Sequence, residues 1–584
     1  MKQWKRYKSY ILPYKSAFIL GPLMMVTEVL GEILLPKFMS MIINHGVAQK
    51  DGGYILKMGL VMAITSFLMA AGGILGAYFA AKASISFTSD LRRDLFARVQ
   101  QFSFKNIDTF STGSLVTRLT NDIQQVQNLI MMGLRMMLRA PGMFLGALVM
   151  AFWMNAELAA VILVVIPLLT AAIVWILRTA YPRFTAMQKA LDTLNSGIQE
   201  VLTNVRVVKS FVREDYEEKR FADTNRELKE AGLRALKIVI ATMPVMMFAM
   251  NVTTLAVVWF GGNLIIGGRM AVGDLTAFTT YIVQILMSLM MLSMVFLQSS
   301  RAMASIRRID EVLDEPIDLS DENASQKDRK VEKGRVEFKD VSFSYREGGE
   351  PVLSHISLTA EPGETIGILG ATGSGKTSLV QLIPRLYDAT SGTVKVGGQD
   401  VRRYHLAALR DAVGIVLQKN LLFSGTIRDN LRWGDPNADD ETLWAACRAA
   451  CADEFLERMP DGLDTDMGQG GVNVSGGQKQ RLCIARTLLK HPKVLIFDDS
   501  TSAVDTATEG KIRHALAALT DVTKLIIAQR ITSVMDADMI VILDDGKVHA
   551  VGTHKELLAN DTIYQEIYAS QMKGDDADGK GIQR

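Results

Sequence analysis

Four long apolar stretches without a formally charged residue constrain this chain more than any other feature. They cover residues 58–79, 158–177, 238–268 and 275–300. The hydrocarbon core of a bilayer is about 30 Å thick, so a helix of roughly 20 apolar residues crosses it. A core helix of a soluble domain would be shorter and polar along one face. We therefore expect the first half of the chain to lie in a membrane.

Two weaker stretches complete this pattern. Residues 17–35 are apolar except for Glu28 and Glu32. Residues 140–154 form a short stretch, which we expect to extend back through 131–138 into a helix that leaves the membrane near Arg135 and Arg139. With the four clear stretches they predict six spans. A cleaved signal peptide is a poor explanation for the first stretch, because the stretch is too long and no small-residue cleavage site follows it.

The basic residues indicate how the spans are oriented. Two segments, 82–139 and 178–237, are long and charged, whereas the connections at 44–57, 155–157 and 269–274 are short and weakly charged. Five basic residues precede the first span, namely Lys2, Lys5, Arg6, Lys8 and Lys15. Basic residues collect on the cytosolic side. We expect both termini in the cytosol and two helical stalks that reach roughly 35–40 Å into it.

Composition and charge exclude other classes of protein. The chain has 64 basic and 62 acidic residues, so its net charge of +2 gives no basic excess for nucleic acid. Three cysteines cannot make a disulfide scaffold. The pattern predicts a transmembrane domain over 1–310, a charged linker with Pro316 over 311–333, an α/β domain over 334–572 and a disordered tail over 573–584.

A glycine-rich segment in the second half has the spacing of a phosphate-binding loop, the Walker A motif. It follows a predicted strand at 365–369 and opens a predicted helix at 378–386. In such a loop, backbone N–H groups and the start of the helix surround phosphates, and the lysine neutralises their charge. The predicted phosphate-binding residues are Gly370, Ala371, Thr372, Gly373, Ser374, Gly375, Lys376, Thr377 and Ser378.

Two further segments belong to the same chemistry. The apolar run 494–498 reads as a buried strand ending in Asp498, whose carboxylate would hold Mg²⁺ together with the Thr377 hydroxyl. Ser475, Gly476, Gly477 and Gln478 precede a helix and form a second cradle for phosphate. One chain thus has two cradles but a single loop lysine. A dimer in which each cradle faces the other subunit's nucleotide explains this.

With these motifs in this order, the chain resembles the ATP-binding cassette (ABC) transporters from the first span to about residue 572. The resemblance implies ATP and Mg²⁺ as cofactors, Tyr345 stacked on adenine, and Gln418 as a further Mg²⁺ contact. Residues 502–505 match the family's D-loop. The fold implied is an α-helical six-span membrane domain of the type IV exporter class, followed by an α/β P-loop nucleotide-binding domain. Residues 106–114 and 204–211 then correspond to coupling helices at the stalk ends.

Two positions depart from the family pattern at the catalytic site. Asp499 follows Asp498, where most active members have Glu as the general base, and Gln529 stands where His is usual. Aspartate is one methylene shorter, and a misplacement of about 1 Å can cost on the order of a hundredfold in rate. Glutamine cannot carry a proton or a charge. We therefore expect Lys376, Asp499 and Gln529 to form a degenerate ATP site in a heterodimer, with a homodimer of two slow sites as the alternative.

The resemblance also implies a function and a location. We expect a subunit of an exporter in the plasma (inner) membrane, paired with a second half-transporter, that moves drug-like, amphipathic small molecules. Export of lipid or peptide, import on the same fold, and an ATP-gated channel or regulator remain alternatives. Glu28 and Glu32 lie four residues apart and so share a helix face. They either attract cationic compounds or lie hydrated near the outer interface.

Overall fold

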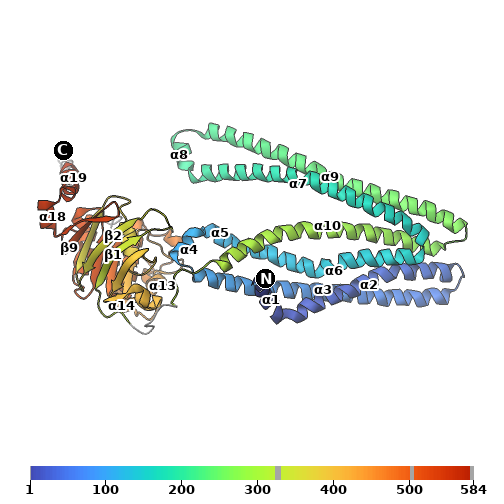
Figure 1. Cartoon of the computed structure of the whole chain (residues 1–584), viewed down its shortest axis with the longest axis horizontal. Coiled ribbons are helices and arrows are strands. Elements are labelled where there is room, and N and C mark those ends of the chain that lie inside the picture. Colours follow the sequence, from blue (N-terminus) through green and yellow to red (C-terminus); the bar gives the residue numbers. More distant parts are fainter. Residues whose placement is uncertain (1, 322–329, 347, 500–504, 579–584) are drawn as a thin grey trace. The chain divides into compact units, whose positions relative to one another are not determined.

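The computed structural model describes residues 2–321, 330–346, 348–499 and 505–578 (Figure 1). The chain forms two compact units, one of residues 1–99 and 113–314 and the other of residues 100–112 and 315–584. The segment 100–112 therefore belongs to the second unit, although the sequence assigned it to the membrane domain. Each unit is described by itself below.

The first unit is entirely helical. Its long helices are α1 (Lys2–Ile11), α2 (Lys15–Met41), α3 (Gly52–Gln100), α6 (Ile123–Met154), α7 (Ala156–Thr203), α9 (Glu214–Ile266) and α10 (Val272–Asp314). Shorter helical segments are η1 (Leu12–Tyr14), η2 (Ile42–Val47), α5 (Thr112–Thr117), η3 (Arg118–Asp122) and α8 (Val205–Ser210). Among the described residues, six helical segments are long and apolar enough to cross a membrane, as the sequence predicts.

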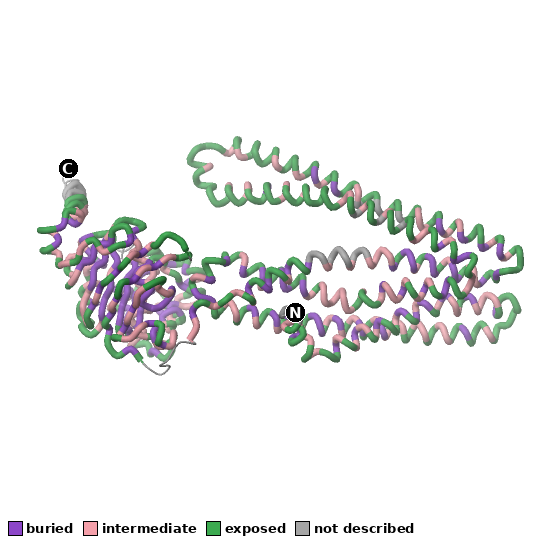
Figure 2. Tube along the Cα trace, in the orientation of Figure 1, coloured by how far each residue is buried: buried purple, intermediate pink, exposed green. Residues whose placement is uncertain are grey.

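Several of these helices are much longer than a bilayer requires. Helices α3, α7, α9 and α10 contain 49, 48, 53 and 43 residues, against the roughly 20 that a span needs. Helices α7 and α9 lie side by side, and α8 joins their far ends at the position of the second predicted coupling turn (Figure 1). Most residues of this hairpin are exposed near α8 (Figure 2). The extra helix length forms the expected stalks.

The second unit begins with the short helix α4 (Phe104–Thr109) and continues as an α/β domain. Its strands are β1 (Val336–Phe343), β2 (Leu353–Ala360), β3 (Thr365–Gly370), β4 (Ser391–Val396), β5 (Gln399–Asp400), β6 (Val413–Val416), β7 (Val494–Asp498), β8 (Thr523–Ile527), β9 (Met539–Asp544) and β10 (Lys547–Gly552). Its later α-helices are α11 (Lys376–Gln381), α12 (Leu406–Ala412), α13 (Ile427–Leu431), α14 (Asp440–Ala449), α15 (Asp453–Leu456), α16 (Gly476–Leu488), α17 (Thr506–Ala517), α18 (His554–Asn560) and α19 (Thr562–Asp578). Short 3₁₀ turns are η4 (Val401–Arg403), η5 (Gly462–Asp464), η6 (Gln469–Gly471) and η7 (Ile531–Ser533).

The strands form two sheets, and one of them positions the phosphate loop. The larger sheet has the order β10-β9-β3-β8-β7-β6, in which β9, β3, β8, β7 and β6 run parallel. The smaller, antiparallel sheet has the order β2-β1-β4-β5. Every residue of β7 is buried, and the interior of this unit is the most buried part of the chain (Figure 2). The residues that follow β3, β8, β7 and β6 therefore lie together at one edge of the larger sheet. Ligands of parallel sheets bind at this edge, beyond the carboxyl ends of the strands.

Three predicted ends differ from the structure. Helix α11 stops at Gln381 and not at residue 386, because Pro384 cannot continue a helix. Helix α10 continues to Asp314, past the predicted boundary at 310, and ends just before Pro316. Helix α19 continues to Asp578, so residues 573–578 are helical where a disordered tail was predicted. Each residue added to an existing helix gains one hydrogen bond, whereas forming the first turn of a new helix is costly. Continuing α19 past residue 572 is therefore inexpensive.

Candidate functional site

The phosphate loop connects β3 to α11, and its backbone requires glycine. Gly375 caps α11 with a φ of +92°, which is a left-handed conformation. A Cβ atom there would lie 2.7 Å from Leu353 Cδ2 and 2.9 Å from the Val352 carbonyl oxygen. Only glycine fits both the angle and the space, so the loop turns tightly into the helix.

Within the loop, two polar groups suit a phosphate. The Lys376 ammonium donates to the carbonyl oxygens of Gly370 at 2.7 Å and Ala371 at 2.8 Å, so it is held across the mouth of the loop. Burial lowers the pKa of Lys376, while Asp499 and Asp498 act in the opposite direction. Ser374 Oγ is buried and has no hydrogen-bond partner among the described residues. A buried donor without a partner is costly, and a phosphate oxygen would supply one.

The predicted Mg²⁺ ligands lie next to each other. Thr377 Oγ1 donates to Asp498 Oδ1 at 2.8 Å, and Asp498 closes the buried strand β7. Burial raises the pKa of Asp498, and the hydrogen bond from Thr377 lowers it. A hydroxyl and a carboxylate are hard oxygen ligands of the kind that Mg²⁺ prefers alongside phosphate oxygens. These residues therefore fit the metal that the phosphate loop implies.

The two unusual catalytic positions contact each other. Gln529 Nε2 donates to Asp499 Oδ2 at 2.6 Å, and Gln418 Nε2 makes a longer contact of 3.5 Å with the same oxygen. Asp499 has a φ of +49°, a left-handed conformation that aspartate tolerates better than most residues. Burial raises the pKa of Asp499, and Gln529, Lys376 and Gln418 lower it. The side chains after β7, β8 and β6 thus meet at one point.

Most of the predicted site residues line one cavity of about 330 Å³. Its described lining comprises Val352, Thr372, Gly373, Gly375, Lys376, Thr377, Ser378, Gln418, Asp498, Asp499, Ile527 and Gln529. Tyr345 lies beside this group, because its hydroxyl is 2.8 Å from Ser378 Oγ. Tyr345 as a residue is 40% exposed, which leaves area for stacking.

Residues 475–478 lie outside this cavity lining. Ser475 caps helix α16: its hydroxyl accepts from Gln478 N–H, and Gln478 Oε1 accepts from Ser475 N–H at 2.9 Å. A Cβ atom on Gly476 would meet nothing within 4 Å, so the start of α16 faces open space. Residues 502–504 of the predicted D-loop lie outside the described residues.

Helix α4 contacts residues that no sequence motif indicated. Tyr387 Oη donates to Asp108 Oδ2 at 2.7 Å, and the ring of Tyr387 packs edge-on against Phe104 at 6.0 Å between centroids. Asn106 Nδ2 donates to the Pro316 carbonyl oxygen at 2.9 Å. The first predicted coupling helix is thereby fixed to the unit that holds the phosphate loop. The only sequence signal for these contacts was that an aromatic residue, Tyr387, follows shortly after the phosphate-loop helix α11.

In the first unit, Glu28 and Glu32 share a single counter-charge. Arg139 Nη1 lies 3.0 Å from Glu28, and Arg139 Nη2 lies 3.2 Å from Glu32. Glu32 and Arg139 each precede the end of their span (Val47 and Met154) by roughly 15 residues, or on the order of 22 Å of helix. The two carboxylates and the one guanidinium together carry a formal charge of −1.

The surrounding helices close around this cluster. Pro36 has no N–H to donate to the Glu32 carbonyl oxygen, and Gln284 Nε2 of α10 donates to it at 3.0 Å. On α3, a Cβ atom at Gly73 would lie 3.1 Å from the Glu28 carboxylate. Helices α2, α3, α6 and α10 thus meet at the cluster. The sequence pointed to the two glutamates but missed their pairing with Arg139.

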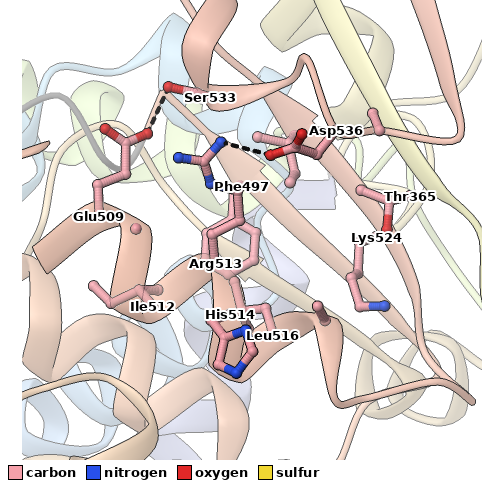
Figure 3. A pocket seen from close by; sticks show the side chains of 14 residues that line it. Thr365, Phe497, Glu509, Ile512, Arg513, His514, Leu516, Lys524, Ser533 and Asp536 are labelled. Carbon is pink, nitrogen blue, oxygen red and sulfur yellow. Dashed lines mark hydrogen bonds and ion pairs between the residues drawn. The ribbon is translucent and has the colours of Figure 1, made fainter. Parts of the chain in front are cut away.

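A second cavity, of about 380 Å³, lies between α17 and the larger sheet (Figure 3). Ser533 Oγ donates to Glu509 at 2.5 Å, and Arg513 pairs with Asp536 at 3.3 Å. Its described lining includes no residue of the phosphate loop. Because its lining is separate from the phosphate loop, we assign this cavity no part in the chemistry.

Two family models match the chain. Residues 18–289 match the ABC transporter transmembrane region, and residues 353–502 match the ABC transporter domain. The first match covers most of the predicted spans, and the second covers the phosphate loop, the second cradle at 475–478 and Asp498.

Whole-length relatives agree with these matches. The ABC transporter ATP-binding protein YfiB of Bacillus subtilis (strain 168) is 41% identical over 564 residues, covering 97% of this chain and 98% of YfiB. The ABC transporter ATP-binding protein Mb1304c of Mycobacterium bovis is 38% identical over 578 residues, covering 98% of this chain and 99% of its own. The solved structure of a bacterial Atm1-family ABC exporter with ATP bound has a TM-score of 0.76 and 26% identity, covering 96% of this chain and 99% of that one.

Proposed function

Since the chain belongs to the ABC transporter family and has the architecture of an exporter half-transporter, we propose that it is one subunit of a heterodimeric, ATP-driven exporter. It supplies a degenerate ATP site and completes the competent site of its partner. The observation that carries this proposal is Asp499 bound to Gln529 beside an otherwise regular phosphate loop. The complex lies in the plasma membrane with both termini of this chain in the cytosol.

At its own site this chain binds ATP but positions water poorly. Lys376 neutralises phosphate charge, and the Thr377 hydroxyl and Asp498 carboxylate are the oxygens that would hold Mg²⁺, which offsets charge developing on the phosphate. Gln418 reaches the same region from the end of β6. The Asp499 carboxylate falls about 1 Å short of the place from which a glutamate would orient the attacking water.

The position of the second cradle supports a dimer. Ser475 and Gly476 are exposed at the start of α16, and residues 475–478 lie outside the described lining of the cavity at their own phosphate loop. The start of a helix attracts phosphate through its free N–H groups and its dipole. We infer that this cradle faces the nucleotide of the partner, where a regular catalytic glutamate performs most of the hydrolysis.

Activity of the separate and combined subunits tests this proposal. We expect this chain alone to hydrolyse ATP at least about a hundredfold more slowly than the pair formed with its partner, because its own base is misplaced. The partner is sought as a six-span half-transporter with Glu after the aspartate that corresponds to Asp498 of this chain. Steady-state ATPase rates of both preparations in the same lipid give the comparison. A chain that alone turns over tens of ATP per second, within the usual range for enzymes, would instead indicate a homodimer.

The charged cluster in the spans supports an amphipathic cation as the transported compound. Two carboxylates face one guanidinium, and a charge within a membrane is expensive unless it serves a pathway or is paired. A monovalent organic cation would neutralise the remaining charge. The surrounding apolar helices would hold the hydrophobic part of such a compound.

Neutralising either carboxylate is expected to lower the transport of a cation more than the transport of a neutral compound. Glu28→Gln or Glu32→Gln should lower transport of a lipophilic cation by about tenfold, equivalent to roughly 1.4 kcal/mol, relative to a neutral compound of similar size. Uptake into inverted vesicles containing the pair measures both compounds. Glu157→Gln is the matched control, because Glu157 also pairs with an arginine, Arg269 at 3.0 Å, but is exposed. Equal loss for both compounds would assign the cluster to helix packing instead.

A further inference from the structure

A series of aromatic contacts joins Tyr345 to helix α4 within the second unit. The ring of Tyr345 lies 5.3 Å from that of Tyr387, nearly perpendicular to it, and Tyr387 in turn lies 6.0 Å from Phe104. Phe343 of β1 packs against both tyrosines, at 4.9 and 5.6 Å. Perpendicular and tilted rings at these separations are attractive pairs in packed interiors. The adenine-stacking candidate and α4 are therefore separated by one buried side chain.

Hydrogen bonds fix both ends of this series. Tyr387 Oη donates to Asp108 of α4 at 2.7 Å. Burial and the neighbouring Asp108 raise the pKa of Tyr387, so its hydroxyl stays protonated and remains a donor at neutral pH. At the other end, the Tyr345 hydroxyl shares a hydrogen bond with Ser378 Oγ of α11. The series thus runs from the phosphate-loop helix through two tyrosines to α4.

The backbone on either side of Tyr387 is held in place. Arg385, itself buried, donates to the Asp388 carboxylate from Nε at 2.8 Å and from Nη2 at 3.0 Å. Arg410 Nη2 donates to the Arg385 carbonyl oxygen at 2.9 Å. The 385–388 segment is therefore held by hydrogen bonds on both sides of Tyr387, and the Tyr387 ring lies between Tyr345 and α4.

Local hydrogen bonds stabilise helix α4 at its first turn. Ser103 caps it, and Asn106 completes the capping box while also donating to the Pro316 carbonyl oxygen. The chain leads from α4 through α5 and η3 directly into the membrane helix α6. A shift of α4 is therefore passed covalently to the membrane unit.

We propose that Tyr387 is a positioning residue that links occupation of the adenine site at Tyr345 to the placement of α4. The proposal rests on the proposed function, because it requires Tyr345 to stack on the base of bound ATP. It implies that the base of the nucleotide, and not its phosphates alone, reaches the coupling helix. A triphosphate without a base should fill the phosphate loop and leave α4 unaffected.

Hydrogen–deuterium exchange on the full-length pair tests this link. ATP should slow exchange in residues 370–381 and also in residues 104–109, whereas inorganic triphosphate should slow exchange only in 370–381. In Tyr387→Phe and Tyr387→Leu, the effect of ATP on 104–109 should fall at least about threefold, while the protection of 370–381 stays within about twofold of the unaltered pair. Tyr404→Phe is the control for a lost buried hydroxyl, because Tyr404 donates to the Val396 carbonyl oxygen elsewhere in the unit.

The outcomes separate the link from the function on which it rests. Unchanged ATP protection of 104–109 in both Tyr387 variants would overturn the link, as would equal protection of α4 by ATP and by triphosphate. Loss of the α4 effect in Tyr404→Phe as well would also overturn it, because the effect would then follow general destabilisation. Failure of ATP to protect 370–381 in the unaltered pair would remove the nucleotide site itself, and the proposed function with it.

Discussion

Gly476→Asp in this chain is expected to lower ATP hydrolysis by the assembled pair by about two to three orders of magnitude. Gly476 opens α16, whose start we propose faces the partner's ATP. A carboxylate about 4 Å from a phosphate charge is repelled by roughly 4 kcal/mol at an effective dielectric of 20, or close to a thousandfold. The steady-state ATPase rate of the purified pair, at saturating ATP, measures the loss.

The fold should tolerate this substitution, which makes the result interpretable. Nothing lies within 4 Å of a Cβ atom at Gly476, and its φ lies outside the left-handed region. A negative charge at the start of a helix also stabilises that helix slightly. The melting temperature of the variant should therefore match that of the unaltered pair. Gly476→Asn is the matched control of equal size without charge, and it should lose at most about tenfold.

Asp499→Ala in the same chain is expected to leave the ATPase rate of the pair almost unchanged, in contrast to Gly476→Asp. If the site containing Asp499 contributes little hydrolysis, removing its carboxylate should change the rate of the pair by less than about twofold. The two variants together test the asymmetry, because one alters the partner's site and the other alters this chain's own. Loss of most activity in Asp499→Ala would refute the degenerate-site proposal, even if Gly476→Asp were also inactive.

The parts of the site that the sequence predicted are those that local chemistry determines. The loop from Gly370 to Thr377 is continuous in the chain, and its glycines fit a backbone that other residues could not adopt. Asp498 is the last residue of β7, and Gln418 lies just beyond the end of the neighbouring parallel strand β6. Both residues therefore reach the same edge of the sheet. The motif pattern predicted the loop and Asp498, whereas Gln418 was implied only by the resemblance to the ABC family.

Pairings between distant helices could not be predicted in the same way. Arg139 lies 107 positions from Glu32, and Tyr387 lies 279 positions from Asp108. An apolar span has no strongly polar face, so hydropathy leaves its rotation about its own axis undetermined. Only the packing of α2 against α6, and of α4 against the rest of the second unit, decides which side chains meet. Opposite charges within apolar spans were the one available signal for the first pair.

Restoring the usual residues at both unusual positions should activate this chain's own ATP site. In the double variant Asp499→Glu, Gln529→His, we expect turnover at this site to rise by about a hundredfold, because the longer carboxylate recovers the missing reach of about 1 Å. Histidine restores a group that can donate to phosphate and carry a charge near neutral pH. The partner's catalytic glutamate is replaced by glutamine in every preparation, so that only this site contributes to the measured rate.

The backbone conformation of Asp499 and its contact with Gln529 determine how much of the hundredfold gain each substitution gives. Asp499 occupies a left-handed backbone conformation, where a longer side chain costs on the order of 1 kcal/mol, a small part of the stability of a domain. Asp499→Glu alone loses the geometry of the 2.6 Å contact with Gln529, so we expect only a part of the gain from it. Retained ATP binding with no rise in rate in the double variant would contradict the prediction. The slow step would then lie in how the partner closes over the site, and not in the residues at 499 and 529.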